Sequence, residues 1–515
     1  MLPKQISTET ERALPQHSFL LLTSNQWMQA VLFGLIGAGV FWPYYRFISP
    51  WLGTAVFLTG VIMVHLRYAC RFILPFPHIA LLIVSVQYIF GAWVSAQYPS
   101  HDPLCNIGMR LPFYLEFSTL VLVACIIGWG IALSKMRPSG IVTVRATTDL
   151  LTGLDALIAI GFVGVILGRG FTESNLNFVF ILLGNLRFIG VFGRMLCKGQ
   201  GWTWRLALVF AGEILFATSN GMFGNFIIWG LWAFALWVFL FTPSWWKLAV
   251  IFAFAVVMLP ALHESKWQLR DKLFGEGSDA DVKATASSRS LFWLSNLGDS
   301  LQKTVTGNLD EEFIGDAVAR YNQGWIIDRV MQYVPACEPF ANGATLKDAF
   351  IATLFPRVLM PNKVIAGGKE NMEKFAGLQL EQGVSMNLGY AGELYANFGY
   401  WGGIVGCLVY TLLFGLLFRW ISVRAFASPL WWSVMPYVGF MAVKTEDGIV
   451  EVLNWTFKAS LVMFAVCFAF PAFRRALFVP EKANQKTESR NQKPEVRRRG
   501  RVRSVMVENV ETLKS

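Results

Sequence analysis

Residues 112–134 read PFYLEFSTLVLVACIIGWGIALS, and this run decides the class of fold. It contains 23 residues and a single charged side chain, Glu116. A helix of that length, rising 1.5 Å per residue, crosses the roughly 30 Å hydrocarbon layer of a bilayer. Similar runs recur along the 515 residues, which are 55% hydrophobic and only 15% charged. Soluble proteins carry about 25% charge, so we expect an all-α polytopic membrane protein.

The apolar runs predict about twelve transmembrane helices. They are expected at 27–46, 50–66, 73–94, 112–134, 149–168, 176–193, 204–220, 222–242, 245–262, 397–419, 428–444 and 450–472. Basic residues follow the even-numbered spans, as Lys135 and Arg137 follow 112–134. Because cytoplasmic loops are rich in Lys and Arg, both termini are expected in the cytoplasm.

The predicted organisation has five parts: a cytoplasmic N-terminus (1–26), nine spans (27–262), a large extracytoplasmic loop (263–396), three spans (397–472) and a cytoplasmic tail (473–515). The N-terminus lacks the apolar core and cleavage site of a signal peptide. The tail holds 12 Lys and Arg against 5 Asp and Glu. Beside a membrane such a tail touches anionic lipid head groups, so we expect lipid contact and not nucleic-acid binding.

The large loop carries 13 Lys and Arg and 17 Asp and Glu. Loops of this length are usually functional. Its early part, EGSDADVKATASSRS (276–290), is expected to be a flexible connector. Helical periodicity from 313 onward predicts one amphipathic helix that ends before Pro335, followed by a short helix that stops at Pro356.

The stretch FPRVLMPNK places Arg357 between Pro356 and Pro361. Proline stiffens the backbone at its own position and at the preceding residue. A guanidinium held in this way suits a phosphate group, because its donors form a planar fork. The alternative is an ion pair between Arg357 and a loop carboxylate. Lys363, a single point charge, is a weaker candidate for the same task.

The stretch NLGYAGELYANFGYWGG (387–403) leads into the tenth expected span and carries Glu393. A carboxylate at a water–lipid boundary beside aromatic residues can serve as an acid or base. The alternative is a carboxylate that stabilises the start of a helix through the helix dipole.

Charged residues within the expected spans form another set of candidates. Arg187 and Glu213 lie in neighbouring spans, where they form either an ion pair or a polar pathway; Glu116 and Lys458 are further members. The seven cysteines show no zinc-ligand spacing. Cys105 and Cys337 both fall in expected outer loops, where a disulfide is possible.

The loop pieces, in their order, resemble the Wzy-type polymerases of O-antigen and exopolysaccharide. The resemblance rests on an Arg-Tyr-Asn helix, FANG, FPRVLMPNK and GELYANFG, and it covers roughly 317–403. Members of that family have many spans, one large periplasmic loop and a GT-C-like plan. They join polyprenyl-diphosphate-linked oligosaccharides outside the cytoplasmic membrane, without nucleotide-sugar and without an obligatory metal or other cofactor.

The resemblance implies roles for residues of this chain. Arg320 and Arg357 would hold the donor diphosphate as leaving group, and Glu393 would orient the acceptor or act as its base. Further substrate contacts are expected from the following residues: Arg289, Arg329, Lys363, Tyr395, Asn397 and Arg169. The arginines Arg289, Arg329 and Arg169 are also alternatives to the first two. The implied partners are the lipid-linked donor and acceptor, a flippase and a chain-length regulator, all at a bacterial inner membrane.

Three other functions stay open at this point. A ligase that moves finished polymer would share the donor chemistry, with His263 as the only loop histidine. A secondary transporter would show internal repeats and binding groups at the midplane, and no duplicated pattern is visible. A structural scaffold is the last alternative.

Overall fold

The computed structural model describes residues 24–100, 105–136, 144, 146–170, 177–220, 223–274, 282, 285–306, 315, 318–319, 321–355, 360, 368–380 and 385–478. Over these residues the chain is helical and contains no strand. Ten of the described helices are long and apolar enough to cross a membrane. The protein is therefore a polytopic membrane protein, as the composition predicts.

Along the chain, the helices that end before residue 275 form a first group and those that begin after residue 285 form a second. The first group comprises α1 (Ser24–Tyr45), α2 (Pro50–Ala69), α3 (Phe76–Val84), the π-helix η1 (Ser85–Phe90), α4 (Gly91–Gln97), α5 (Leu111–Leu133), α6 (Thr148–Gly168), α7 (Asn177–Leu196), α8 (Trp202–Asn220), α9 (Gly224–Phe241) and α10 (Trp245–Phe274). The second group comprises α12 (Ala286–Thr306), α14 (Gly324–Tyr333), α15 (Ala344–Leu354), α16 (Lys369–Ala376), α17 (Gly389–Ala427), α18 (Trp431–Val438), α19 (Ile449–Ala469) and α20 (Pro471–Leu477).

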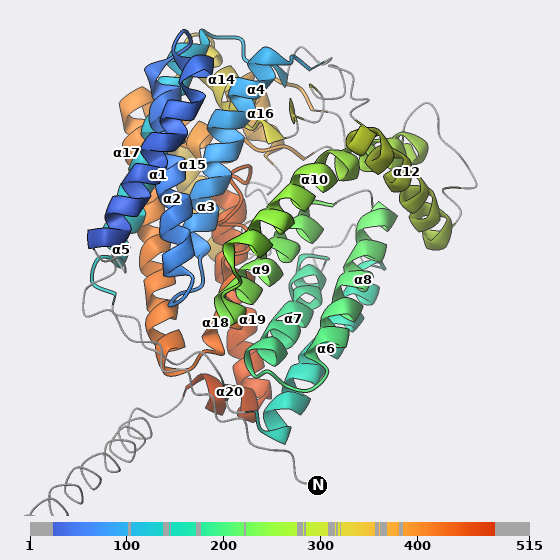
Figure 1. Ribbon diagram of the computed structural model, residues 1–515. Coiled ribbons are helices and arrows are strands. Elements are labelled where there is room, and N and C mark those ends of the chain that lie inside the picture. The colour runs from blue at the N-terminus through green and yellow to red at the C-terminus, as the bar shows by residue number, and fades with distance from the viewer. Residues whose placement is uncertain are drawn as a thin grey trace, which may run out of the picture.

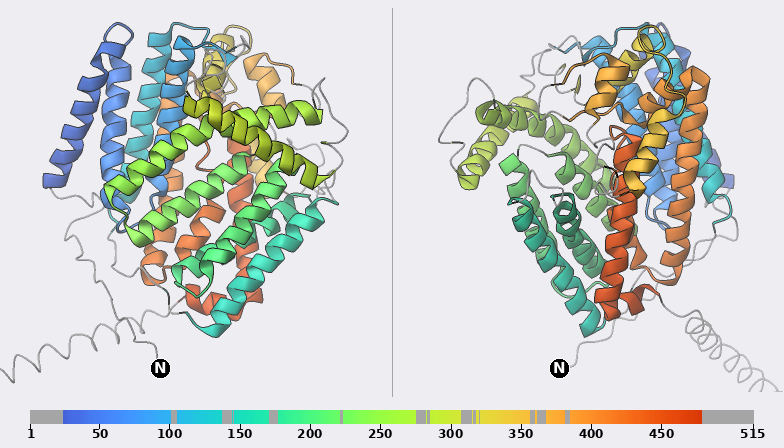
Figure 2. Two further views of the ribbon diagram at one scale, coloured as in Figure 1. Left: turned by 45° about the vertical axis from the view of Figure 1, so that its right-hand side comes forward. Right: turned by 180° about the vertical axis from the view of Figure 1, so that it is seen from behind.

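Two sets of spanning helices meet at α18 and α19. Figure 1 shows α1 to α5 with α17 on one side and α6 to α9 on the other. The shared core is aromatic: Phe76 stacks on Trp232 with ring centroids 5.0 Å apart, and Phe188 stacks on Trp229 at 3.9 Å. The helices α14 and α16 lie at one end of the bundle and α20 at the other (Figure 2).

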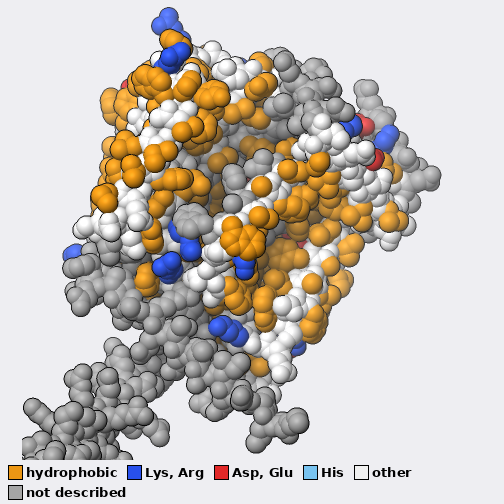
Figure 3. Space-filling model, viewed as in Figure 1, with side chains coloured by type: hydrophobic (Ala, Val, Ile, Leu, Met, Phe, Trp, Pro, Cys, Tyr) orange, Lys and Arg blue, Asp and Glu red, His pale blue; other side chains and the backbone are white. Residues whose placement is uncertain are grey.

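The outer surface of the bundle is largely apolar. Figure 3 shows hydrophobic side chains over most of the described part of one face. Large side chains such as Phe41, Ile166 and Trp401 are well exposed on spanning helices. Water would make such a surface costly, whereas lipid matches it.

Two of the twelve expected spans differ from the structure. The seventh, α8, forms a helix but is less apolar than the ten candidate spans, and it carries both Arg205 and Glu213. The eleventh, expected at 428–444, is helical only in α18, which contains Pro436 and ends at Val438. The chain then runs without regular helix to Gly448.

The segment expected as the large loop contains more helix than the sequence predicts. Helix α10 continues to Phe274 and α17 already begins at Gly389. The expectation of a flexible connector up to residue 290 was wrong, because α12 begins at Ala286. The helix α15 ends at Leu354, just before Pro356, as predicted.

The single amphipathic helix expected from residue 313 is interrupted. The described residues 315, 318–319 and 321 are helical, but α14 begins separately at Gly324 and ends at Tyr333 as predicted. The chain turns at Asn322 and Gln323, where the Gln323 N–H donates to the Gln87 carbonyl of η1 at 3.0 Å. A contact with another part of the chain therefore interrupts the helical periodicity.

The intramembrane charges are paired as one of the alternatives predicts. Arg187 and Glu213 form an ion pair between α7 and α8, with side chains 4% and 3% exposed. The Glu116 carboxylate accepts from the Tyr400 hydroxyl at 3.0 Å, and Lys458 lies over the Phe178 ring. Cys105 and Cys337 are both free thiols, so the disulfide is not formed.

Candidate functional site

A break in α17 positions the predicted acid or base. Gly399 has φ +71°, a left-handed conformation that glycine adopts without steric cost. The Phe340 ring lies 3.1 Å from the place a Gly399 side chain would take. The break separates a short helical segment, Gly389–Phe398, from the long spanning part of α17. Glu393, Tyr395 and Asn397 all lie on this short segment.

Glu393 is buried, with 2% of its surface exposed. Its carboxylate accepts a hydrogen bond of 2.8 Å from the Ile449 N–H, the first residue of α19. The Thr345 hydroxyl of α15 also bonds this carboxylate. A negative charge at a helix N-terminus is favourable because unpaired N–H groups and the helix dipole point there. Glu393 thus stabilises the start of α19 and not of its own helix.

The irregular segment 444–448, between α18 and α19, brings more charge to Glu393. Lys444 and Asp447 form an ion pair at 3.9 Å, with side chains only 10% and 13% exposed. The Lys444 ammonium also donates to the Asn225 side-chain oxygen at 3.4 Å and lies over the Phe440 ring. Buried charges are costly unless they are paired in this manner.

A second glutamate, Glu451, completes the group, which we call the carboxylate cluster (Glu393, Asp447 and Glu451, with Lys444). Gly448 lies between two of its members. A methyl group on Gly448 would be 2.6 Å from the Glu451 Oε2 atom and 3.3 Å from the Glu393 Oε2 atom. Only glycine leaves room there for both carboxylates. Among the described residues, no group of acidic, His or Cys side chains is arranged to hold a metal ion.

The segment 444–448 is held against η1 on its other side. The Tyr88 hydroxyl donates to the Thr445 carbonyl at 2.8 Å, and the Thr445 hydroxyl bonds the Gln87 side chain. π-Helical turns are rare and frequently occur at functional sites. Here the turn carries the two polar residues that hold the non-helical segment.

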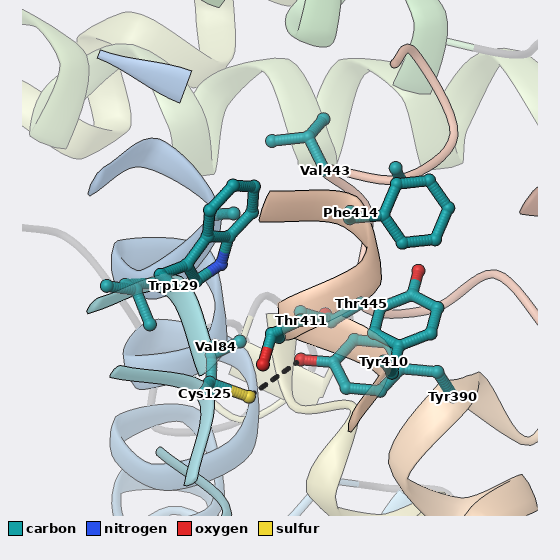
Figure 4. A pocket seen from close by; sticks show the side chains of 12 residues that line it. Val84, Cys125, Trp129, Tyr390, Tyr410, Thr411, Phe414, Val443 and Thr445 are labelled. Atoms are coloured by element: carbon teal, nitrogen blue, oxygen red, sulfur yellow. Dashed lines mark hydrogen bonds between the residues drawn. The ribbon is translucent and has the colours of Figure 1, made fainter. Parts of the chain in front are cut away.

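Next to Thr445 of this segment lies a small cavity of about 10 Å³, whose other lining residues include Tyr390, Tyr410 and Cys125. Figure 4 shows the stacked rings of Tyr390 and Tyr410, with the Tyr390 hydroxyl directed at the Cys125 thiol. Such a volume holds at most about one water molecule. Aromatic side chains therefore pack closely around Thr445, next to the segment that carries Lys444 and Asp447.

The electrostatics of the cluster favour proton exchange near neutral pH. Burial raises the pKa of Asp447 to about 7; Lys444 opposes the shift, and Glu446 and Glu451 add to it. A carboxyl group with a pKa near the working pH can both take up and release a proton. Strongly perturbed carboxyl groups of this kind are typical of functional sites.

Two further predicted residues lie beside Glu393 but have internal partners. Asn397 is fully buried: its amide group donates to the Thr345 hydroxyl at 2.7 Å, and its oxygen accepts from the Gly343 N–H at 2.9 Å. Asn397 thereby fastens the start of α15 to α17. The Tyr395 ring packs edge-on against Phe117 and Phe340. Both contacts indicate that these residues position the site.

The predicted arginines within the described residues lie on three different elements. Arg329 of α14 donates to the Ala376 carbonyl of α16 at 3.2 Å, close above α17. Arg289 of α12 donates to the Ser219 carbonyl at the end of α8, on the other side of the bundle (Figure 1). Arg169 is exposed at the end of α6. Of these three described arginines, only Arg329 lies in the region around Glu393.

Arg320, Arg357 and Lys363 lie outside the described residues, and their roles stay predictions. The helix α15, which precedes Pro356 in the sequence, packs along α19 beside the cluster (Figure 2, right). Its small buried residues Ala349 and Ala352 allow close contact.

Sequence reasoning missed Lys444, Asp447, Glu451 and Thr345. A signal was present: KTEDG (444–448) places three charged residues at the end of the eleventh expected span and directly after it. It was overlooked because its partners, Gln87 and Glu393, are far away in the chain.

The chain was compared with family models, with curated proteins and with solved structures, and none of the three comparisons gives a match.

Proposed function

We propose that the protein is a membrane glycosyltransferase that polymerises polyprenyl-diphosphate-linked oligosaccharide repeat units into O-antigen or exopolysaccharide. The observation that carries this proposal is the carboxylate cluster. The motif GELYANFG, on which the resemblance to Wzy-type polymerases rests, places its glutamate in a buried group of carboxylates beside an ion-paired lysine.

In the proposed reaction, an acceptor hydroxyl attacks the anomeric carbon of the donor sugar. The bond from that carbon to the diphosphate oxygen breaks, and the diphosphate leaves with the bonding electron pair. Arg320 and Arg357 stabilise the charge that develops on it. The hydroxyl proton passes to Glu393, and Asp447 exchanges protons with it near neutral pH.

The exposed apolar face of α15 supports the proposal that the substrate is lipid-linked. One of its faces packs against α19, whereas Phe350 and Leu354 on the other are 57% and 54% exposed. An apolar face beside a spanning helix can contact a polyprenyl chain, while the following segment FPRVLMPNK supplies cations for the diphosphate. In this arrangement the carboxylate cluster lies near the junction between the polyprenyl chain and the diphosphate.

On the resemblance to Wzy-type polymerases we place the protein in a bacterial inner membrane, and on the distribution of basic residues we place both termini in the cytoplasm. The carboxylate cluster then faces the outer leaflet. A flippase that delivers the donor and a regulator of chain length are the expected partners.

The test uses protein purified in nanodiscs and a polyprenyl-diphosphate-linked repeat unit, with products resolved by length. Wild type should give a ladder, and Arg357→Ala at equal expression should give none. Glu116→Gln, which removes a charge from a described span outside the stretch FPRVLMPNK, is the control and should keep the ladder.

Other outcomes would replace the proposal. A single transfer that requires a second acceptor, without a ladder, would identify a ligase. Binding and passage of the lipid-linked sugar across the bilayer without either product would identify a transporter.

A further inference from the structure

A groove lies at the end of the bundle that carries α20, opposite the carboxylate cluster. It has a volume of about 350 Å³ and is formed by α17, α18, α19 and α20. Its walls are mostly aromatic or aliphatic, with Trp420, Trp431, Met463, Phe464 and Phe468 among the lining residues. It extends along α19 from Ser460 to Phe468, a length of about 12 Å at 1.5 Å per residue.

The groove opens toward the lipid. Phe464 and Phe468 on one wall are 75% and 78% exposed, and Trp420 on the other is 48% exposed. The floor is rigid, because the Trp431 indole N–H donates to the Leu477 carbonyl at 3.1 Å and the Trp431 ring packs edge-on against Trp420 and Phe478. An acyl chain fits this lining, since it needs no polar partner.

The charge at the groove is positive and confined to one end. Arg474 lines the groove at α20, and no acidic residue is among the described residues that line it. Arg424 lies 3.6 Å above the centre of the Trp420 ring, at the same end of α17. No ion pair joins either arginine to an acidic side chain in the described part of the chain. Basic pockets between spanning helices on the cytoplasmic side bind anionic head groups.

We propose that this groove is a binding site for one anionic phospholipid of the leaflet that α20 faces. An acyl chain lies along α19, and the phosphate of the head group is held by Arg474. The arrangement of a long apolar wall with a single cationic end matches an amphiphile with one anionic head. The site is remote from the carboxylate cluster and does not depend on the proposed polymerase activity.

Native mass spectrometry of the full-length protein, released from nanodiscs of equal phosphatidylglycerol and phosphatidylcholine, tests the proposal. Wild type should retain one phosphatidylglycerol several-fold more often than phosphatidylcholine. Arg474→Gln should abolish this preference. Arg475→Gln is the matched control: it removes the same charge from the next residue, which is exposed but does not line the groove, and it should keep the preference.

A groove-filling variant separates the apolar wall from the charge. Ser460→Phe places a ring in the groove and should reduce retention of both lipids, whereas Leu461→Phe, an exposed neighbour outside the lining, should not.

Four results would overturn the proposal. They are equal retention of the two lipids by wild type, equal effects of the two arginine variants, displacement of phosphatidylglycerol by an equimolar polyprenyl phosphate, and a dimer in which a second copy fills the groove. Melting temperatures of all variants, measured in the same nanodiscs, show whether each is folded.

Discussion

Replacing Glu393 by Gln separates its catalytic role from its structural one. The Gln side-chain oxygen can still accept the 2.8 Å hydrogen bond from the Ile449 N–H. The loss of charge at the start of α19 costs about 0.3–1 kcal/mol through the helix dipole. Removal of a negative charge beside Glu451 offsets part of this cost. We therefore expect the melting temperature of Glu393→Gln to stay close to that of wild type.

Activity should respond very differently. A positioned general base contributes about 10²- to 10⁴-fold to a rate, and an amide cannot accept the proton. The rate of polymer synthesis by Glu393→Gln, measured from the ladder at saturating substrate, should fall by that factor.

The variant Glu393→Ala provides the structural comparison. It leaves the Ile449 N–H buried without its acceptor, at a cost of about 1–3 kcal/mol, so it should lower the melting temperature as well as the activity. Full activity of Glu393→Gln, with a normal melting temperature, would refute the base role. Loss of stability in both variants to the same extent would refute the account of the hydrogen bond.

The remaining predictions concern other parts of the chain. Glu213→Leu leaves Arg187 buried without a counter-charge and should destabilise by about 3–5 kcal/mol; the double variant with Arg187→Leu should recover most of the lost melting temperature, and no recovery would argue against coupling. Because the pKa of Asp447 is raised to about 7 in the folded protein, the folded state holds a proton that the unfolded state has lost between about pH 4 and 7. Stability should therefore fall as pH rises through this window, and Asp447→Asn should flatten the fall in melting temperature between pH 5 and 7.5. Arg357→Lys should lose nearly as much polymer synthesis as Arg357→Ala, since a point charge cannot replace the planar fork; a fully active Lys variant would contradict this. Deletion of residues 481–515 should leave polymer synthesis largely intact, and inactivity of a normally inserted protein would show that the tail has another role.

The spans were predictable because each depends on its own residues. A run of about 20 apolar residues is enough to indicate a spanning helix, and α5 and α6 lie within a residue or two of the expected positions. The pairing of Arg187 with Glu213 was likewise accessible, since a buried charge needs a partner and neighbouring spans offered only a few.

The site was less predictable because its contacts are remote in sequence. Glu393 bonds Ile449, 56 residues away, and Thr445 bonds Gln87, 358 residues away. Hydrophobic periodicity shows which residues of a helix share one face, but not which distant part of the chain that face contacts. The sequence NFGYWGG offers three glycines, and nothing local to it determines that Gly399 takes the left-handed conformation; the Phe340 ring that packs there comes from another segment.

The shortness of α18, which has eight residues, explains two features next to it: the polar segment 444–448 and the apolar groove. A spanning helix satisfies its own backbone groups, and irregular backbone at membrane depth is stable only where protein groups replace those bonds. Beyond Val438, the Thr445 carbonyl accepts from the Tyr88 hydroxyl and the Ile449 N–H donates to Glu393, while the Thr445 side chain bonds Gln87. The short helix thus gives a polar segment in which Lys444 and Asp447 are paired. α18 also forms the floor of the groove between its two longer neighbours, where Trp431, Val434 and Val438 line it. The same interruption therefore gives a charged cluster at one end of the bundle and an open apolar groove at the other.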